Sequence, residues 1–317
     1  MDSCVSRLYG AVARELFPDA EYFEFPAGEA AKNPATAIEL CRFAAQKGFD
    51  RHASFVAFGG GVTGDLTGFA AAIYMRGVKV FQIPTTLLAM VDSSIGGKTG
   101  VDIPEGKNLI GAFHQPRQVF IDPEFLRTLP PAELRSGLAE VVKSAMILDA
   151  ELFARLEEVG TGLVDDPDYV KVYPEIILRV CALKAKIVIE DERESGIRAL
   201  LNYGHTFGHA VETLGNFSLR HGLAVSIGMS VAARLAVSLG RLQPEEAARQ
   251  QRLLEALGMP TKWPEEFAPA DALQVMKRDK KNRDGAITVI LPVRIGRAEI
   301  VTGVPEAELL AAIGADQ

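Results

Sequence analysis

The chain has 317 residues, of which 48% are hydrophobic and 24% are charged, an ordinary composition for a soluble globular enzyme. Its formal net charge of −7 argues against a nucleic-acid-binding protein, whose surface needs an excess of Lys and Arg. No window approaches the apolar length that spans a membrane. Cys4, Cys41 and Cys181 are scattered without disulfide or metal-ligand spacing, so we expect a cytoplasmic protein.

A chain of this length exceeds the size at which one hydrophobic core keeps growing, so we expect two domains. The first part alternates strands and helices, which predicts an α/β domain with a parallel sheet. The expected elements are a helix at 33–47, a strand at 54–58, a helix at 64–75 and a strand at 78–83. We place this domain at residues 1–128.

The pattern changes near Pro130-Pro131 and becomes mostly helical. A strand pair is expected at 286–292 and 297–301, after a turn at 282–285. The expected helices are 132–158, 168–189, 204–214, 221–239 and 244–256. We therefore predict a second, mostly α-helical domain at residues 129–317.

A glycine-rich turn follows the first expected strand. Gly59, Gly61 and Gly64 match G-x-G-x-x-G, in which glycines let backbone N–H groups approach a phosphate at a helix N-terminus. Taken alone, the match fits an ordinary strand-to-helix turn equally well. The acidic residue that the common dinucleotide fold places about twenty positions further on lacks its usual context. Asp65 lies at the expected helix start instead, which predicts a nucleotide-binding loop of another kind.

One acid and several histidines indicate a metal site. A helix would place His205 and His209 on one face, and His221 opens the next expected helix. Glu140 lies in an apolar helical stretch, where a carboxylate needs a partner. One carboxylate and two or three imidazoles suit a catalytic divalent metal. Histidines at helix ends are often ordinary polar residues, but three of the chain's five fall within 205–221.

Several basic residues lie beside glycines or inside apolar stretches of this acidic chain. Surface lysines usually belong to a solvated face, whereas a cation beside glycine suits the close approach of a phosphate or carboxylate. If these residues converge, they predict an anionic substrate. They are Arg76, Lys98, Lys107, Lys143, Lys184, Arg198, Lys280 and Lys281.

Distinctive segments are spread along nearly the whole chain. They are FPAGE (25–29), GGGVTGDLTGF (59–69), MRGV (75–78), QIPTTLLAMVDSSIGGKTGVD (82–102), GKNLIGAFHQP (106–116), LAEVVK (138–143), LLNYGHTFGHAVE (200–212) and HGLAVSIGM (221–229). Together they resemble the 3-dehydroquinate synthase family. The resemblance implies an N-terminal nucleotide-binding α/β domain, a mostly helical C-terminal metal domain and an active site between them.

The resemblance also implies the cofactors and their residues. It makes Glu140, His205 and His221 the ligands of one divalent metal, zinc or cobalt, and His209 a nearby acid/base group. It places NAD+ against Asp2, Glu29, Lys32, Gly60, Gly61, Val62, Asp65, Thr85, Thr86, Lys107, Phe125, Thr128 and Leu129.

The implied reaction converts 3-deoxy-D-arabino-heptulosonate 7-phosphate to 3-dehydroquinate and phosphate in the shikimate pathway. Oxidation of one carbon by NAD+ lets phosphate leave, the hydride is then returned, and an aldol closure forms the ring. The chain would be a homodimer in which Arg76 reaches the neighbouring subunit's substrate. The residues implied to meet the substrate are Asp92, Lys98, Asn108, Lys143, Lys184, Arg198, Asn202 and either Lys280 or Lys281.

The chain departs from the family pattern at several positions. The usual first strand pair is missing, and residues 1–5 resemble the end of its second strand. Cys4 stands where the family usually has Asn, and Leu223 where it usually has Glu.

Three alternatives stay open. A sibling sugar-phosphate cyclase is disfavoured by the intact GGKTG and KN segments. An NAD(P) alcohol dehydrogenase of similar two-domain design needs no cations that hold a phosphate. A truncated, non-catalytic paralogue is favoured by the missing strands but disfavoured by the retained chemical residues.

Overall fold

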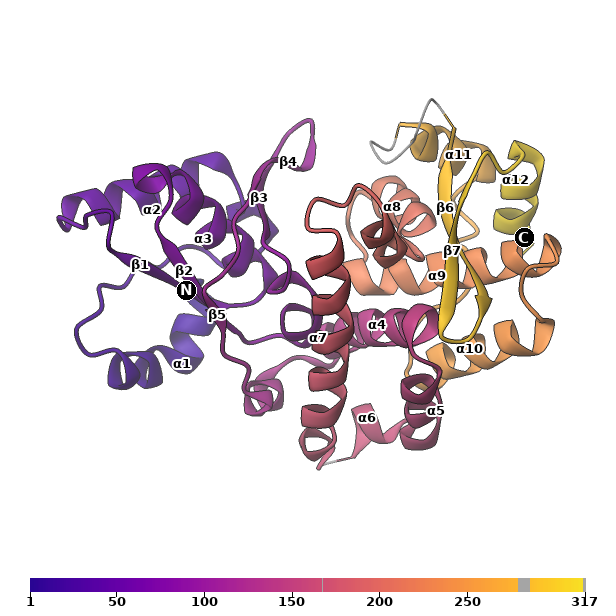
Figure 1. Cartoon of the computed structure of the whole chain (residues 1–317), viewed down its shortest axis with the longest axis horizontal. Helices are drawn as coiled ribbons and strands as arrows, with labels where there is room; N and C mark the ends of the chain where they lie inside the picture. Colours follow the sequence, from indigo (N-terminus) through magenta and orange to yellow (C-terminus); the bar gives the residue numbers. More distant parts are fainter. Residues whose placement is uncertain (167, 279–285, 316–317) are drawn as a thin grey trace. The chain divides into compact units, whose positions relative to one another are not determined.

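The computed structural model describes residues 1–166, 168–278 and 286–315. The chain forms two compact units, Met1–Leu129 and Pro130–Gln317 (Figure 1). The division falls at the Pro130-Pro131 pair, where the sequence pattern also changes.

The first unit is built on a small parallel sheet, as predicted. Strands β1 and β2 pair in parallel from Ser54↔Lys79 to Gly59↔Pro84, and β5 pairs in parallel with β2. Helix α3 packs on the sheet and α2 packs on α3, so that apolar side chains such as Leu66 are fully buried. The elements are α1 (Ser3–Leu16), α2 (Pro34–Gln46), β1 (Ser54–Gly59), α3 (Gly61–Ile73), β2 (Lys79–Pro84), β3 (Lys98–Ile103), β4 (Gly106–Phe113) and β5 (Gln118–Val119).

The start of the chain differs from the expectation that residues 1–5 resemble the end of a strand. Only Asp2 makes a bridge, which is parallel to Phe25, and helix α1 begins at Ser3. The Asp2 side chain accepts hydrogen bonds from the backbone N–H groups of Cys4 and Val5, at 2.8 and 3.0 Å. This N-cap satisfies donors that a helix start leaves open, so the residues after Asp2 are helical.

The second unit is mostly helical and closes with an antiparallel strand pair, as predicted. Helix α9 packs against α4, α8, α10, α12 and β6, which makes it the centre of the unit. The elements are α4 (Pro131–Leu148), α5 (Ala150–Val159), α6 (Gly162–Asp165), α7 (Tyr173–Glu190), α8 (His205–Leu214), α9 (His221–Ser238), α10 (Pro244–Ala256), α11 (Pro269–Lys277), β6 (Thr288–Arg294), β7 (Arg297–Thr302) and α12 (Glu306–Gly314).

Two of the expected helices are interrupted. The segment 132–158 breaks at Asp149, which ends α4 and caps α5 by accepting a 3.0 Å hydrogen bond from the Leu152 N–H. Within 168–189, a short 3₁₀ turn precedes α7, which has Pro174 in its first turn. The expected turn at 282–285 lies outside the described residues.

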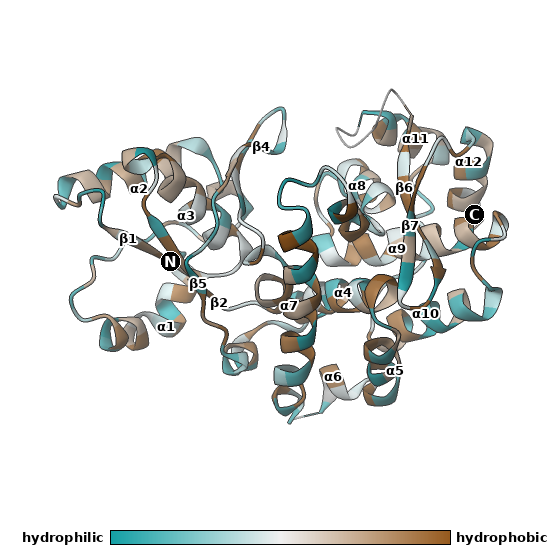
Figure 2. Cartoon of the chain, in the orientation of Figure 1, coloured by the Kyte–Doolittle hydropathy of each residue, from teal (hydrophilic) through white to brown (hydrophobic). Residues whose placement is uncertain are grey.

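Helix α9 corrects the expectation that no window approaches a membrane span. Among the described residues it is the one helix whose length and composition would allow it to cross a membrane. Its 18-residue window is 72% buried inside the protein. Figure 2 shows hydrophobic residues along this helix. A buried core helix of a globular unit passes the same test, which makes this weak evidence for a membrane.

Candidate active site

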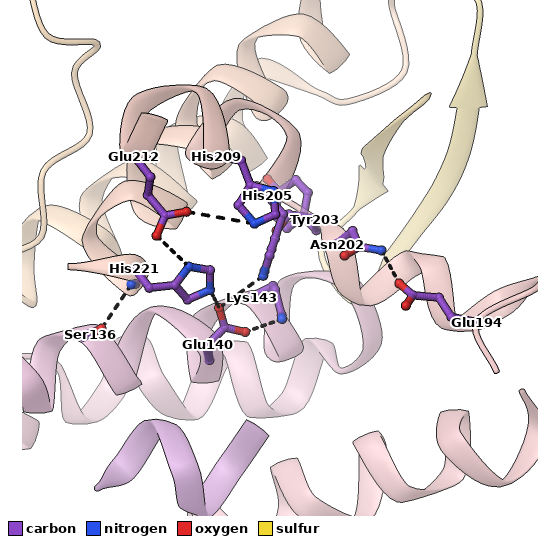
Figure 3. A network of polar contacts seen from close by, with 11 residues as sticks. Ser136, Glu140, Lys143, Glu194, Asn202, Tyr203, His205, His209, Glu212 and His221 are labelled. Carbon is purple, nitrogen blue, oxygen red and sulfur yellow. Dashed lines mark hydrogen bonds and ion pairs between the residues drawn. The ribbon is translucent and has the colours of Figure 1, made fainter. Parts of the chain in front are cut away.

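Three side chains from separate helices converge in the second unit (Figure 3). Glu140 lies on α4, His205 at the start of α8 and His221 at the start of α9. Glu140 Oε1 is 3.8 Å from His205 Nε2 and 3.7 Å from His221 Nε2. These three residues form a group whose ligand atoms all lie within 4.8 Å of one another. Such an arrangement of one carboxylate and two imidazoles suits a divalent metal.

Glycines let these helices approach closely enough for the side chains to meet. A Cβ on Gly222 would lie 2.0 Å from Ser136 O, and the Gly222 N–H donates a 3.1 Å hydrogen bond to Ser136 Oγ. This contact sets the start of α9 against α4 one turn before Glu140. A Cβ on Gly228 would lie 1.9 Å from Gly204 O, so α8 also begins directly against α9. Only glycine fits at either contact without a shift of the backbone.

Both histidine rings are held by their Nδ1 atoms. His205 Nδ1 lies 3.1 Å from the carbonyl oxygen of Tyr203, and His221 Nδ1 lies 3.2 Å from Glu212 Oε1. When each oxygen accepts a hydrogen bond from Nδ1–H, the lone pair of a neutral ring is left on Nε2, the atom that faces Glu140. Burial lowers the pKa of His221, but the hydrogen bond and charge of Glu212, together with Glu140, raise it overall.

Glu140 is buried, with 1% of its surface exposed, and forms an ion pair with the buried Lys143 one turn along α4. Neither of its carboxylate oxygens has a hydrogen-bond partner. A buried carboxylate in this state is costly, and a cation between it and the two Nε2 atoms would offset that cost. The donor set therefore fits a bound divalent metal.

The loop between α7 and α8 is organised around Asp191. Its Oδ2 accepts hydrogen bonds from the backbone N–H groups of Gly196 and Arg198, at 2.7 and 3.0 Å, and its Oδ1 accepts one from Ser195. Partial burial alone would raise the pKa of Asp191, but these backbone hydrogen bonds hold it at about 2. The loop is thereby fixed immediately before Asn202.

Polar groups that the sequence predicted as substrate contacts lie in and beside this loop. Arg198 is buried and donates to the carbonyl oxygen of Glu192. Asn202 donates a 2.6 Å hydrogen bond to Glu194 Oε1. Lys184 is buried on α7, which packs against the 3₁₀ turn carrying Arg198 and Asn202. Lys280 and Lys281 lie outside the described residues.

The glycine-rich turn of the first unit begins a helix. Gly59 ends β1, Gly60 is the N-cap of α3 and Gly61 is its first residue, so the turn presents backbone N–H groups at a helix N-terminus. Asp65 lies in the second turn of α3 rather than at its start. Thr85 and Thr86 follow β2. Thr86 lies against Gly60, because a Cβ on Gly60 would be 3.0 Å from Thr86 Cγ2.

Lys32 is the centre of a polar cluster in the same unit. Its buried Nζ lies 2.7 Å from Asp65 Oδ2, donates a 2.7 Å hydrogen bond to Asn108 Oδ1 and lies 4.0 Å from Glu29 Oε1. Lys107 also faces Glu29, at 3.6 Å. Burial lowers the pKa of Lys32, but the carboxylates of Asp65, Glu29 and Asp102 together raise the pKa overall. Burial also raises the pKa of Asp65 despite the nearby ammonium group.

The other predicted residues of the first unit occupy several local structures. Asp92 lies in a π-helical turn at Ala89–Ser93, and Lys98 begins β3. Arg76 is exposed after α3 and has a φ of 65°. Tyr9 of α1 packs edge-on against Phe125 and shares a hydrogen bond with Thr128. Besides capping α1, Asp2 accepts a 3.3 Å hydrogen bond from Thr63 Oγ1. Val62 and Leu129 are the remaining residues predicted to contact NAD+.

The sequence matches two family models that together cover most of the chain. Residues 22–136 match the 3-dehydroquinate synthase N-terminal model, and residues 137–282 match the C-terminal model. The chain belongs to the 3-dehydroquinate synthase family. A 3-dehydroquinate synthase from Synechococcus sp. is 47% identical over 312 residues, which cover 96% of this chain and 84% of that protein.

Solved structures of related cyclases share the fold. ValA, a 2-epi-5-epi-valiolone synthase from Streptomyces hygroscopicus subsp. jinggangensis with NAD+ and Zn2+ bound, is 35% identical. It superposes with a TM-score of 0.90 and covers 98% of this chain and 88% of its own. A 2-deoxy-scyllo-inosose synthase complexed with carbaglucose-6-phosphate, NAD+ and Co2+ is 27% identical, with a TM-score of 0.89 over 100% of this chain and 89% of that one.

Sequence reasoning overlooked two acids of this 3-dehydroquinate synthase family member. Glu212 contacts His221, and Asp191 organises the loop that holds Arg198. Glu212 follows His209 by three positions in the GHTFGHAVE segment, so helical spacing could have drawn attention to it. Asp191 carried no comparable signal, because most of its partners are backbone N–H groups.

Proposed function

We propose that the chain is an enzyme that converts 3-deoxy-D-arabino-heptulosonate 7-phosphate to 3-dehydroquinate and phosphate. The observation that carries the proposal is the convergence of His205 Nε2 and His221 Nε2 on the buried Glu140, in a chain with 3-dehydroquinate synthase relatives at 47% identity.

Glu140, His205 and His221 are proposed to hold one divalent metal, zinc or cobalt. The related structures with bound Zn2+ and Co2+ support that choice of ion. When bound, the metal would supply Lewis-acid chemistry that makes a substrate hydroxyl more acidic. Tyr203 O and the Glu212 carboxylate keep the two Nε2 atoms directed at the site. His209 is proposed as an acid/base group nearby, since its ring centroid lies 5.5 Å from that of His205.

NAD+ is proposed to bind the first unit, because two related cyclases contain it. When bound, NAD+ would supply reversible hydride transfer, which would make elimination of phosphate feasible without net oxidation. The N-terminus of α3 at Gly60 and Gly61 would face the pyrophosphate. The remaining proposed contacts are Asp2, Glu29, Lys32, Val62, Asp65, Thr85, Thr86, Lys107, Phe125, Thr128 and Leu129.

The anionic substrate would be held by cationic and amide side chains. Lys143, Lys184 and Arg198 are buried, so their charges act with little screening by water. Orientation and charge stabilisation are the main contributions expected of them. The proposed substrate residues are Asp92, Lys98, Asn108, Lys143, Lys184, Arg198, Asn202 and either Lys280 or Lys281.

A homodimer is proposed as well, in which Arg76 serves the neighbouring subunit's substrate. The exposure of Arg76 and of Met75, at 52%, supports a contact at this turn. We also propose that the enzyme works in the cytoplasm, since the thiols of Cys4, Cys41 and Cys181 suit a reducing compartment.

The decisive experiment measures phosphate release from the heptulosonate phosphate, with NAD+ and metal supplied together, singly and not at all. Release is expected only when both are present. A sibling cyclase activity is the second candidate, because ValA shares the fold with a TM-score of 0.90. Parallel assays with other sugar phosphates, glucose 6-phosphate among them, separate the two. Release that persists in Glu140→Ala would contradict the proposed metal site.

A further inference from the structure

We infer that Glu212 is a positioning residue that fixes the orientation of His221 at the metal centre and ties His209 to the same network. The role rests on the metal site proposed above and adds a residue to it. Glu212 lies near the end of α8 and is buried, with 6% of its surface exposed.

The geometry shows a carboxylate between two imidazoles (Figure 3). Glu212 Oε1 lies 3.2 Å from His221 Nδ1, and Oε2 lies 4.0 Å from His209 Nε2. His221 is therefore held at one ring nitrogen while its other nitrogen, Nε2, lies 3.7 Å from Glu140. A ring held in this way cannot turn Nε2 away from Glu140 without losing the hydrogen bond to Glu212.

The chemistry of the pair points to a role at the metal rather than to packing alone. Burial of a carboxylate is costly, and an uncharged side chain of similar size would fill the same space without that cost. A carboxylate that accepts a hydrogen bond from Nδ1–H makes the other ring nitrogen, Nε2, a more basic ligand. His205 has a neutral carbonyl oxygen, that of Tyr203, in the equivalent position. Glu212 thus makes Nε2 of His221 a stronger metal ligand than Nε2 of His205.

An alternative role for Glu212 is that of a direct ligand. His209, Glu212 and His221 form a second group whose ligand atoms lie within 4.8 Å of one another. An ion in that group would have to displace the proton that His221 Nδ1 shares with Glu212. The positioning role therefore predicts one ion per chain, and the ligand role predicts two.

The test measures Co2+ stoichiometry and affinity by competition with a chromophoric chelator, together with the visible spectrum of the bound cobalt. Glu212→Ala is expected to bind about 10- to 100-fold more weakly than the wild type. Glu212→Gln keeps the size of the side chain and one acceptor oxygen but loses the charge, so a smaller loss and a changed cobalt spectrum are expected. The matched control is Glu246→Gln, a partly buried acid that accepts a 2.8 Å hydrogen bond from the Ile295 N–H and lies on α10, which contains no histidine.

The outcomes separate this role from the metal site itself. Unchanged affinity and an unchanged spectrum in Glu212→Gln, while Glu140→Ala loses the ion, would overturn the role of Glu212 alone. Two ions in the wild type, one of which Glu212→Gln loses, would also overturn it. A wild type that binds no cobalt would overturn the metal centre and this role together. The denaturation midpoint of metal-free Glu212→Gln is expected to be no lower than that of the metal-free wild type, which would show that a weaker affinity does not come from misfolding.

Discussion

Gly222 and Ser136 form the contact that brings the metal cluster together. The Gly222 N–H donates a 3.1 Å hydrogen bond to Ser136 Oγ, and a Cβ on Gly222 would lie 2.0 Å from Ser136 O. His221 precedes this glycine, and Glu140 lies one helical turn after Ser136. The distance between the two ligands therefore depends on the absence of one side chain.

Gly222→Ala is expected to push α9 away from α4. Overpacking of this kind costs about 1–3 kcal/mol of unfolding free energy, and the shift of His221 should weaken metal binding as well. Chemical denaturation and cobalt titration check the two effects. Gly162→Ala serves as the control, because the nearest atom to its new Cβ is Val159 Cγ1 at an ordinary 3.6 Å. Normal cobalt affinity in Gly222→Ala would refute the claim that the distance between His221 and Glu140 depends on this glycine.

Lys143→Met should make stability depend strongly on metal. The substitution leaves Glu140 buried without its ammonium partner, which is expected to cost about 3–5 kcal/mol in the metal-free protein. Saturating Zn2+ should recover part of this loss, because the ion takes over as the opposite charge. Denaturation with and without a chelator measures the difference.

The control for this prediction is Lys171→Met, which breaks an exposed 2.8 Å ion pair with Asp168. Exposed pairs of this kind are worth about 1 kcal/mol or less, so little change is expected with or without metal. An equal loss of stability in Lys143→Met under both conditions would argue against a metal beside Glu140.

Asp191→Asn should alter the response of the second unit to acid. The pKa of Asp191 in the folded protein is about 2, below its ordinary value of 3.8. A lowered pKa means that the ionised form stabilises the fold, fully above pH about 4 and progressively less as the pH falls toward about 2. The variant lacks this contribution at every pH, so its unfolding free energy should vary less between those values. Denaturation at a series of pH values tests this, with Asp168→Asn as a control.

The same variant should affect substrate binding more than turnover. An amide has one acceptor oxygen, so it cannot serve both the N–H groups of Gly196 and Arg198, which share Oδ2 of Asp191, and the N–H group of Ser195, which bonds to Oδ1. Loss of about one hydrogen bond in the loop that carries Arg198 would raise KM roughly tenfold with a smaller change in kcat. A fall in kcat with KM unchanged would contradict this placement of Arg198 in substrate binding.

Lys32→Met is expected to weaken NAD+ binding. Lys32 holds Asp65 at 2.7 Å and Asn108 at 2.7 Å, and both would lose their shared partner. We expect the Kd for NAD+ to rise by about tenfold or more, as measured by calorimetry. Lys47→Met, which removes an exposed 2.9 Å pair with Glu21, should bind NAD+ like the wild type. Matching affinities of the two variants would remove Lys32 from the proposed cofactor site.

The sequence by itself determined the local structure and the chemical types present. Hydrophobic period and glycines were sufficient to predict β1, α3 and β2, because these signals act between neighbours in the chain. They failed at Asp149, where a cap divides one apparent helix, and at Asp2, where a cap begins a helix in place of a strand. The histidine spacing in GHTFGHA pointed to a metal but left its ligand set open.

Only the tertiary structure decided how those residues meet. Glu140, His205 and His221 come together because Gly222 and Gly228 permit backbone contacts between helices, and such contacts leave no periodic trace in the chain. The role inferred for Glu212 and the anchoring of the 191–198 loop by Asp191 depend on hydrogen bonds formed after the helices have packed. The sequence pattern indicates which face of a helix or strand is buried, whereas close packing determines which atoms come into contact.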